Sequence, residues 1–336
     1  MSFKSKIKQK ILKSSDMYNF YESEYKNTGK KINELEDKLK SHEKTLNSYQ
    51  NLFNTLYLDY ELTPKGMLEG VQDICIELLI FVSNICKKYE LEWWLDYGNL
   101  LGAVRHGNFV PWDDDMDIGM MREDYNKFIN AVHKEVEEKE IDWIDIRWRK
   151  RKIDGKTTWS FIQIFLDKPG FSHTLAQVDV FPYDYIEDFT GDIEDYKGEN
   201  LNNIYFETKM SFYRDLIKGY DIEKVLKRYY KNLNLSHEKE EYLLPGVEGS
   251  CGPKNLYKLM VLETDKVFPL KTVKFRDYEF PCPNDCDYYL KSIYGNYMRI
   301  PKNVRGHGRL NKLRYDDINL LRQSVEELRE FNANFK

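Results

Sequence analysis

The chain has 336 residues, of which 41% are hydrophobic and 15% aromatic, and its 51 Lys and Arg against 56 Asp and Glu give a formal net charge of −5. This apolar content excludes an intrinsically disordered chain, and the lack of a basic excess argues against wholesale binding of nucleic acid. The length corresponds to about two domains, or to one large domain with an appendage.

Targeting signals are not evident in the sequence. The most apolar run, residues 78–86, is far shorter than the roughly 20 residues of a membrane-spanning helix, and the N-terminus lacks the apolar stretch of a signal peptide. The five cysteines, an odd number, indicate reduced thiols rather than a disulfide framework. We therefore expect a cytoplasmic protein.

Residues 1–17 form a basic N-terminal segment, with lysine at positions 4, 6, 8, 10 and 13. In a helix, Phe3, Ile7 and Ile11 would share one side and the lysines would surround it. Such a helix would suit peripheral contact with the anionic inner face of the cell membrane. The alternative is a solvated, frayed tail.

Residues 18–62 contain a heptad pattern. From Ile32 to Tyr60 the apolar side chains alternate in spacings of three and four, and only His42 is polar on that stripe. Such a pattern over about four heptads predicts a long helix that seeks a partner. We expect either a homo-oligomeric coiled coil or a helix folded back on the body of the protein.

The rest of the chain alternates between helix and strand signals. Thr63 and Pro64 predict the start of a core helix whose apolar positions run from residue 67 to 85. Strand patterns follow at 92–96, 116–120, 141–148, 158–166 and 177–183, with helical stretches at about 99–105 and 123–139. The chain closes with a charged amphipathic helix at about 314–332. The prediction is an α/β (α+β) fold with a catalytic core at 63–190 and a mostly helical C-terminal part at 191–336.

Two acids in the middle of the chain predict a metal site. If residues 115–119 form a strand, its period of two points Asp115 and Asp117 to the same face. At about 7 Å and an effective dielectric constant near 20, their repulsion is roughly 2–3 kcal/mol, which a fold rarely tolerates without a cation. Mg²⁺ and Mn²⁺ take oxygen ligands of this kind. The alternative is that these acids cap loops or pair with arginine.

A third acid, Asp179, lies within the apolar strand pattern of residues 177–182. A buried, unpaired carboxylate is costly. On a strand next to 115–119, Asp179 would complete a three-carboxylate metal site of the kind that clamps a phosphoryl group for in-line displacement. A loop cap or an arginine partner is again the alternative.

Several further residues could bind phosphate. Gly98 precedes the helical stretch 99–105, so the backbone N–H groups of the turn could approach a phosphate, and Arg105 and His106 at the other end could neutralise its charge. The alternative is a surface arginine paired to a nearby aspartate. Near the C-terminus, Arg305, His307 and Arg309 form a basic cluster that could close over a diphosphate or lie in a solvated loop.

These residues belong to a longer motif. The segment 98–119, GNLLGAVRHGNFVPWDDDMDIG, resembles the signature of the LicD family of phosphotransferases, to which the catalytic part of fukutin-related protein is also similar. The resemblance continues through Asp124-Tyr125, the segment 178–182 and a C-terminal block at 280–307, and covers roughly residues 70 to 310. Asn99 departs from the family pattern, which usually has Thr or Ser there, although Asn can still donate to phosphate.

The resemblance implies a nucleotidyltransferase-like fold, with a mixed sheet flanked by helices, and a metal-dependent transferase. Its activity would be transfer of a substituted phosphate, most familiarly phosphocholine from CDP-choline, onto a sugar hydroxyl of a cell-surface glycan or its lipid-linked precursor, with release of CMP. Relatives use CDP-ribitol or similar alditol donors. Asp115, Asp117 and Asp179 would be the catalytic and metal-binding residues. The substrate-binding residues would be Gly98, Asn99, Arg105, His106, Arg305 and His307.

Other functions remain open at this point. A true nucleotidyltransferase would release pyrophosphate instead of CMP. A catalytically inactive scaffold is opposed by the three acids, since a binding module gains nothing from repelling carboxylates. Cys282 and Cys286, with Cys251 and either His237 or His307, could in principle hold zinc, but their spacing is loose.

Overall fold

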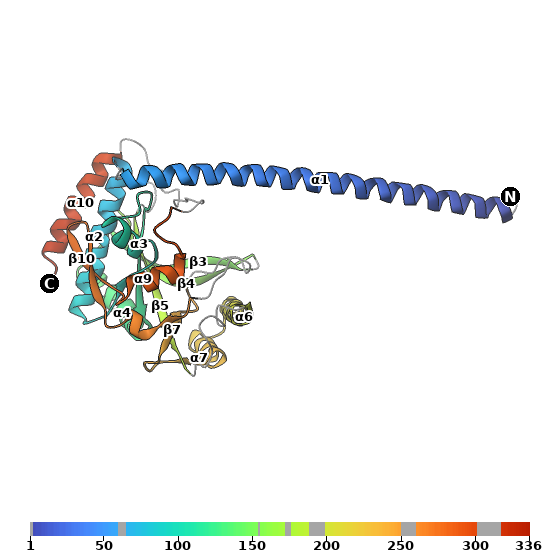
Figure 1. Cartoon of the computed structure of the whole chain (residues 1–336). Coiled ribbons are helices and arrows are strands. Elements are labelled where there is room, and N and C mark those ends of the chain that lie inside the picture. Colours follow the sequence, from blue (N-terminus) through green and yellow to red (C-terminus); the bar gives the residue numbers. More distant parts are fainter. Residues whose placement is uncertain are drawn as a thin grey trace. The chain divides into compact units, whose positions relative to one another are not determined.

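The computed structural model describes residues 3–59, 65–153, 155–171, 176–187, 199–249, 260–300 and 317–336. The chain divides into two compact units (Figure 1). One unit comprises residues 1–61 and 299–304, and the other comprises the rest of the chain. Within the described residues, no helix combines the length and the apolar character needed to cross a bilayer.

The first unit is built on α1 (Phe3–Asp59), one uninterrupted helix of 57 residues. It runs through both the basic segment and the heptad region, so the predicted boundary between residues 17 and 18 lies inside a single helix. Two residues from far along the chain bind it. Gln50 Nε2 donates to the Ile300 carbonyl at 2.6 Å, the Ile300 N–H donates to Asn54 Oδ1 at 3.1 Å, and Arg299 donates to Asn51 Oδ1 at 2.9 Å.

The second unit is built around an eight-stranded mixed sheet. Its main path runs β1 (Trp94–Leu95), β2 (Met116–Met121), β5 (Gln177–Ile186), β4 (Lys156–Leu166) and β3 (Ile144–Ile153). Strands β2 and β5 are parallel, and all other pairs are antiparallel. The predicted mixed α/β architecture, with helices against a mixed sheet and a long N-terminal helix, is confirmed.

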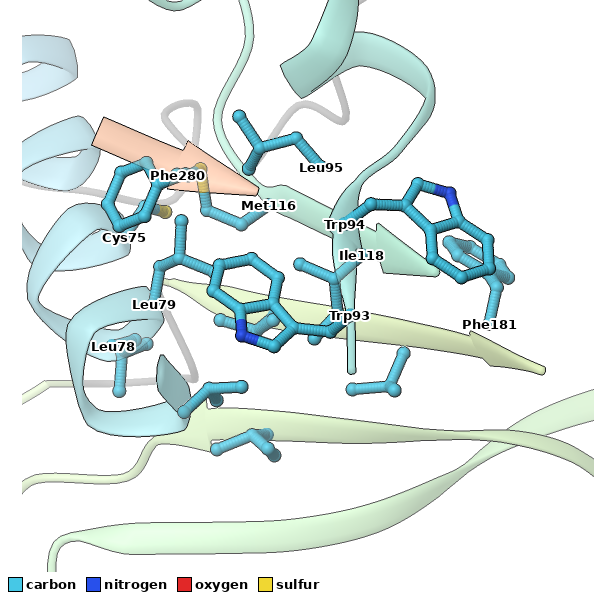
Figure 2. Packing of buried hydrophobic residues seen from close by; sticks show 14 of the residues in the cluster. Cys75, Leu78, Leu79, Trp93, Trp94, Leu95, Met116, Ile118, Phe181 and Phe280 are labelled. Carbon is cyan, nitrogen blue, oxygen red and sulfur yellow. The ribbon is translucent and has the colours of Figure 1, made fainter. Parts of the chain in front are cut away.

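The apolar face of this sheet lies against α2 (Met67–Lys88) and α4 (Arg122–Glu138), both of which contact β2 and β5. Neighbouring side chains alternate between the two faces, as the pleat of a strand requires. Figure 2 shows Trp93 near Leu79 and Ile118, on the side of α2, while Trp94 lies beside Phe181.

Helix α10 (Asp317–Ala333) packs on α2, and Figure 1 shows the two side by side. Polar contacts tie them together, because Glu77 is buried and its carboxylate accepts hydrogen bonds from Arg329 Nε at 3.2 Å and Asn332 Nδ2 at 3.1 Å. The predicted C-terminal amphipathic helix is therefore confirmed, and its apolar side completes the core around α2.

The start of α2 differs from the prediction. Thr63 and Pro64 lie outside the described residues, and the helix begins at Met67 after Gly66, whose φ is +74°. A residue with positive φ cannot continue a right-handed helix, so the helix cannot extend back to Pro64. The Thr-Pro pair is a strong signal for a helix start, but the positive φ of Gly66 makes α2 begin after it.

Among its described residues, the C-terminal part contains helices and also five short strands. The helices α6 (Glu199–Ile217), α7 (Ile222–Leu233), α8 (Thr264–Val267) and α9 (Cys286–Tyr294) accompany β6 (Leu235–Ser236), β7 (Tyr242–Pro245), β8 (Leu262–Glu263), β9 (Lys271–Phe275) and β10 (Tyr278–Cys282). Strands β6, β7 and β8 extend the main sheet, whereas β9 and β10 form a separate hairpin. Strands of two to five residues are too short to show a clear alternation of apolar and polar residues, so the sequence pattern did not predict them.

A buried ion cluster joins α4 to the sheet and to the segment after β7. Arg122 donates to both oxygens of Asp184 at 2.8 Å and to both oxygens of Glu248 at 2.7 and 2.8 Å. All three residues are buried. Although burial by itself would lower the pKa of Arg122, the two carboxylates raise it, so the arginine stays charged.

The cluster leads to a stability prediction. In Arg122→Met, two buried carboxylates would face each other without their cation, and we expect the free energy of unfolding to fall by about 3–5 kcal/mol in urea denaturation at neutral pH. The matched control is Lys127→Met on the same helix, which removes the exposed pair with Glu123 and should leave stability nearly unchanged. Equal stabilities for the two variants would contradict this account.

Candidate functional site

The register of two parallel strands brings the predicted acids together. Asp117 of β2 lies directly opposite Asp179 of β5, and Asp115 immediately precedes β2. Carboxylate oxygens of Asp115, Asp117 and Asp179 lie within 4.8 Å of one another. Asp115 and Asp179 are buried and Asp117 is half-buried. The strands that bear these acids are therefore adjacent, as predicted.

Helices α2 and α3 (Tyr97–His106) hold the backbone of the acidic turn. Asn99 of α3 donates to the Asp115 carbonyl at 3.2 Å and accepts from the N–H of Asp117. From α2, Gln72 Nε2 donates to the Asp113 carbonyl at 2.9 Å. In this structure the side chain of Asn99 thus binds the backbone of the turn, which gives it a positioning role distinct from the expected phosphate contact.

Two glutamines orient Asp179, and sequence reasoning missed both. Gln163 Nε2, from β4, and Gln177 Nε2, two residues before Asp179 on β5, donate to the same oxygen, Oδ1, at 2.7 and 2.6 Å. The period of two places Gln177 on the face of Asp179, so the sequence contained a signal for it. The sequence contained no such signal for Gln163, because the position of this residue depends on the antiparallel pairing of β4 with β5.

Gly98 lies against the acidic cluster. A Cβ atom at this position would be 2.6 Å from Asp113 Oδ2 and 3.9 Å from Asp117 Oδ2, so any side chain would displace the Asp113 carboxylate. Asp113 also groups with Asp114 and Asp115 as a second set of adjacent carboxylates. The first turn of α3 therefore lies close to the acids.

A further buried carboxylate, that of Asp96, caps the start of α3. It accepts hydrogen bonds from the Tyr97 N–H at 2.7 Å, the Tyr183 hydroxyl at 2.7 Å and the Tyr289 hydroxyl at 2.8 Å, while its own N–H donates to the Asp117 carbonyl at 3.0 Å. Burial raises the pKa of Asp96 to about 6, although the three donors oppose this shift. The network ties the start of α3 to β2, β5 and α9.

The electrostatics of the cluster suit a divalent cation. The pKa of Asp117 is raised well above its ordinary value, first by burial and then by the charges of Asp115, Asp179 and Asp113. A set of close, buried oxygen donors that repel one another matches the preference of Mg²⁺ and Mn²⁺ for hard ligands. The donor set therefore fits such an ion.

Tyr294, at the end of α9, belongs to the same neighbourhood. Burial of its hydroxyl group and the charges of Asp117, Asp96 and Asp113 raise its pKa well above the usual value, yet 41% of the residue is exposed. Tyr294 is therefore partly open to solvent and within electrostatic range of Asp117. It lies in the C-terminal block at 280–307 that carries the family resemblance.

The residues expected to bind phosphate do not all lie beside the acidic cluster. Arg105 and His106 lie at the far end of α3, about 10 Å of helix rise from Gly98. Arg105 Nε donates to His106 Nε2 at 2.8 Å, and its Nη1 donates to the Tyr297 carbonyl at 2.6 Å. Burial lowers the pKa of His106 to about 4, so Arg105 supplies the positive charge at this end at neutral pH.

The C-terminal basic cluster, Arg305, His307 and Arg309, lies outside the described residues. Two of the residues considered for zinc, Cys251 and His307, do as well. His237 stacks on Tyr230 at 4.5 Å. Among the described residues, the groups able to hold a metal ion consist of aspartates alone, so the zinc alternative gains no support there.

Comparison with known proteins supports the motif. Residues 90–244 match the family model described as LicD/FKTN/FKRP, nucleotidyltransferase domain. A segment of 74 residues is 37% identical to the lipopolysaccharide cholinephosphotransferase LicD of Haemophilus influenzae, covering 22% of this chain and 28% of that protein. A segment of 62 residues is 43% identical to the human ribitol 5-phosphate transferase FKRP, covering 18% of this chain and 12% of that protein.

A longer match is to the uncharacterized protein RT0683 of Rickettsia typhi, with 30% identity over 157 residues, 46% of this chain and 47% of that protein. The matched segments thus span about half or less of the relatives' own lengths. The family match lies within the range of residues 70–310 expected from the sequence, and it includes β2, β5 and all three acids. The resemblance is confirmed there: residues 90–244, which contain the acidic cluster, match the LicD family model.

Proposed function

We propose that this chain is a metal-dependent transferase with a nucleotidyltransferase-like fold, which moves a substituted phosphate from a CDP-linked donor onto a sugar hydroxyl and releases CMP. The observation that supports this most is the meeting of Asp115, Asp117 and Asp179 at the start of a parallel strand pair, beside the glycine turn, within a LicD-family domain. Three repelling carboxylates on a buried face have little structural value without a cation.

Asp115, Asp117 and Asp179 would hold Mg²⁺ or Mn²⁺. When bound, such an ion neutralises charge on the donor diphosphate and orients it for in-line displacement. The chain's own residues do the positioning. Gln163 and Gln177 fix the Asp179 carboxylate, and Asn99 fixes the backbone that presents Asp115 and Asp117.

The proton of the acceptor must leave as the new bond forms. The acceptor oxygen bonds to the phosphorus that bears the substituent, the bond from this phosphorus to the CMP oxygen breaks, and the hydroxyl proton passes to a carboxylate of the cluster. We assign this role to Asp179, whose orientation is set by two amides. Arg105 and Gly98, at opposite ends of α3, and the cluster of Arg305 and His307 would bind the donor phosphates.

The substituent is proposed to be choline, and the acceptor a cell-surface glycan or its lipid-linked precursor. Support comes from the relative named lipopolysaccharide cholinephosphotransferase. The relative named ribitol 5-phosphate transferase supports an alditol phosphate as the alternative. We place the reaction in the cytoplasm or at the inner membrane face, with residues 63–190 as the core and 191–336 completing the domain.

The first test measures CMP release from a panel of CDP-linked donors with Mg²⁺ or Mn²⁺ and a glycan extract. We expect release from one donor, and a drop of at least about 100-fold in Asp115→Ala, because the variant removes a ligand of the charge-neutralising ion. Asp142→Ala, an exposed acid of the same unit, is the control. Pyrophosphate release from a nucleoside triphosphate without CMP release would favour true nucleotidyl transfer instead.

The second test concerns the metal itself. In a chelating buffer at neutral pH, Asp117→Asn should melt at a higher temperature than the wild type, because it removes a carboxylate whose burial and repulsion by the neighbouring acids raise its pKa. Mg²⁺ or Mn²⁺ should raise the melting temperature of the wild type and have little effect on the variant. If both proteins respond equally to the ions, the assigned ligands are wrong.

The third test concerns Tyr294. Tyr294→Phe keeps the ring and removes the hydroxyl, which is within electrostatic range of Asp117, so we expect an unchanged melting temperature and a fall of about tenfold in kcat/KM for the donor. The control is Tyr220→Phe, a solvent-exposed tyrosine on the turn before α7. Activity equal to that of the control would exclude Tyr294 from the site.

A further inference from the structure

We propose that α1 pairs with α1 of a second copy of this chain as a parallel, in-register, two-stranded coiled coil. This inference rests on the first unit alone and is independent of the proposed reaction.

The apolar stripe of α1 is exposed from Ile32 to Leu56. Positions a of the heptad are Ile32, Leu39, Leu46 and Phe53, and positions d are Leu35, His42, Tyr49 and Leu56. The seven apolar members are between 42% and 67% exposed. The stripe continues toward the N-terminus through Tyr25 and Tyr21, which are 82% and 64% exposed. A long helix with such a stripe gains its stability by burying it against a partner.

The polar contacts within the first unit fall on another side of the helix. Arg299 and Ile300 bind Gln50, Asn51 and Asn54, which occupy positions e, f and b of the heptad. These positions flank or oppose the a and d stripe. The contacts therefore leave the stripe available to a second helix.

The charges beside the stripe select the orientation. Lys31 and Lys38 occupy g positions, and Glu36 and Glu43 occupy e positions. In a parallel pair, each g residue faces the e residue five positions further along the other chain. Lys31 would then meet Glu36 of the partner subunit, and Lys38 would meet Glu43 of the partner subunit. All four side chains are exposed.

An antiparallel pair is disfavoured by the same residues. There, e positions face e positions, which would set Glu36 and Glu43 against acids of the other chain. The register follows from His42, the polar member of the stripe between Ile32 and Leu56. Only the unshifted register lets the two histidines face each other, because a shift by one heptad would place each against Leu35 or Tyr49.

The number of chains is tested first by the mass of the full-length protein in solution, measured by sedimentation equilibrium. We expect two chains. Lys31→Glu with Lys38→Glu should raise the dissociation constant of the dimer by about tenfold or more, because each facing pair then becomes two acids. Glu36→Lys with Glu43→Lys should raise the dissociation constant likewise, because each facing pair then becomes two bases.

Mixing these two double variants should restore a tight heterodimer, because each facing pair again joins opposite charges. In an antiparallel pair neither double variant alone would weaken the dimer, because lysine already faces lysine and glutamate already faces glutamate in the wild type. Since all four positions are exposed, the substitutions should leave the melting of the second unit unchanged, which serves as the folding control.

The register is tested by cross-linking. Thr28→Cys lies at a d position and should form an interchain disulfide in full yield with a mild thiol oxidant, whereas Lys30→Cys at an f position should form little, as should the wild type with its native cysteines. A single-chain mass, three or more chains, failure of the charge rescue or absence of the Thr28→Cys cross-link would each overturn the proposal.

Discussion

The site depends on the parallel pairing of β2 with β5. This pairing sets Asp117 opposite Asp179, and Asp115 follows because it precedes the same strand. Since side chains alternate along a strand, a slip of one residue in register would turn Asp179 to the apolar face and break the cluster. The apolar neighbours Ile118 and Val180, which are fully buried on the opposite face, therefore hold the acids in place as well as forming the core.

The surrounding network converts that register into a rigid cluster. Asn99, Gln72 and the two amides on Asp179 reach the acids from α3, α2, β4 and β5. Their hydrogen bonds fix the backbone of the acidic turn and the Asp179 carboxylate. Burial, and then the charges of the neighbouring acids, raise the pKa of Asp117. A fold that assembles so many partners around groups that repel one another maintains a preorganised charge site, which is what transfer of a phosphoryl group requires.

The two units show how differently the same chain uses apolar side chains. In the second unit the apolar side chains of α2 and the sheet are enclosed, as for Leu79 and Ile118. In α1 they stay exposed along one line, as for Leu35 and Leu39. The first arrangement is complete within one chain, whereas the second is explained by association, with the flanking charges choosing the partner's direction.

The sequence alone determined the long N-terminal helix, the core helix α2, strands β2 and β5 and the three acids, because each leaves a local period or a costly buried charge. Only the tertiary structure decided the start of α2 at Met67, the backbone-binding role of Asn99 and the place of Gln163 at the site. These depend on segments far apart in the sequence coming together. Local periodicity specifies which face a residue occupies on its own element, and packing between elements decides what that face meets.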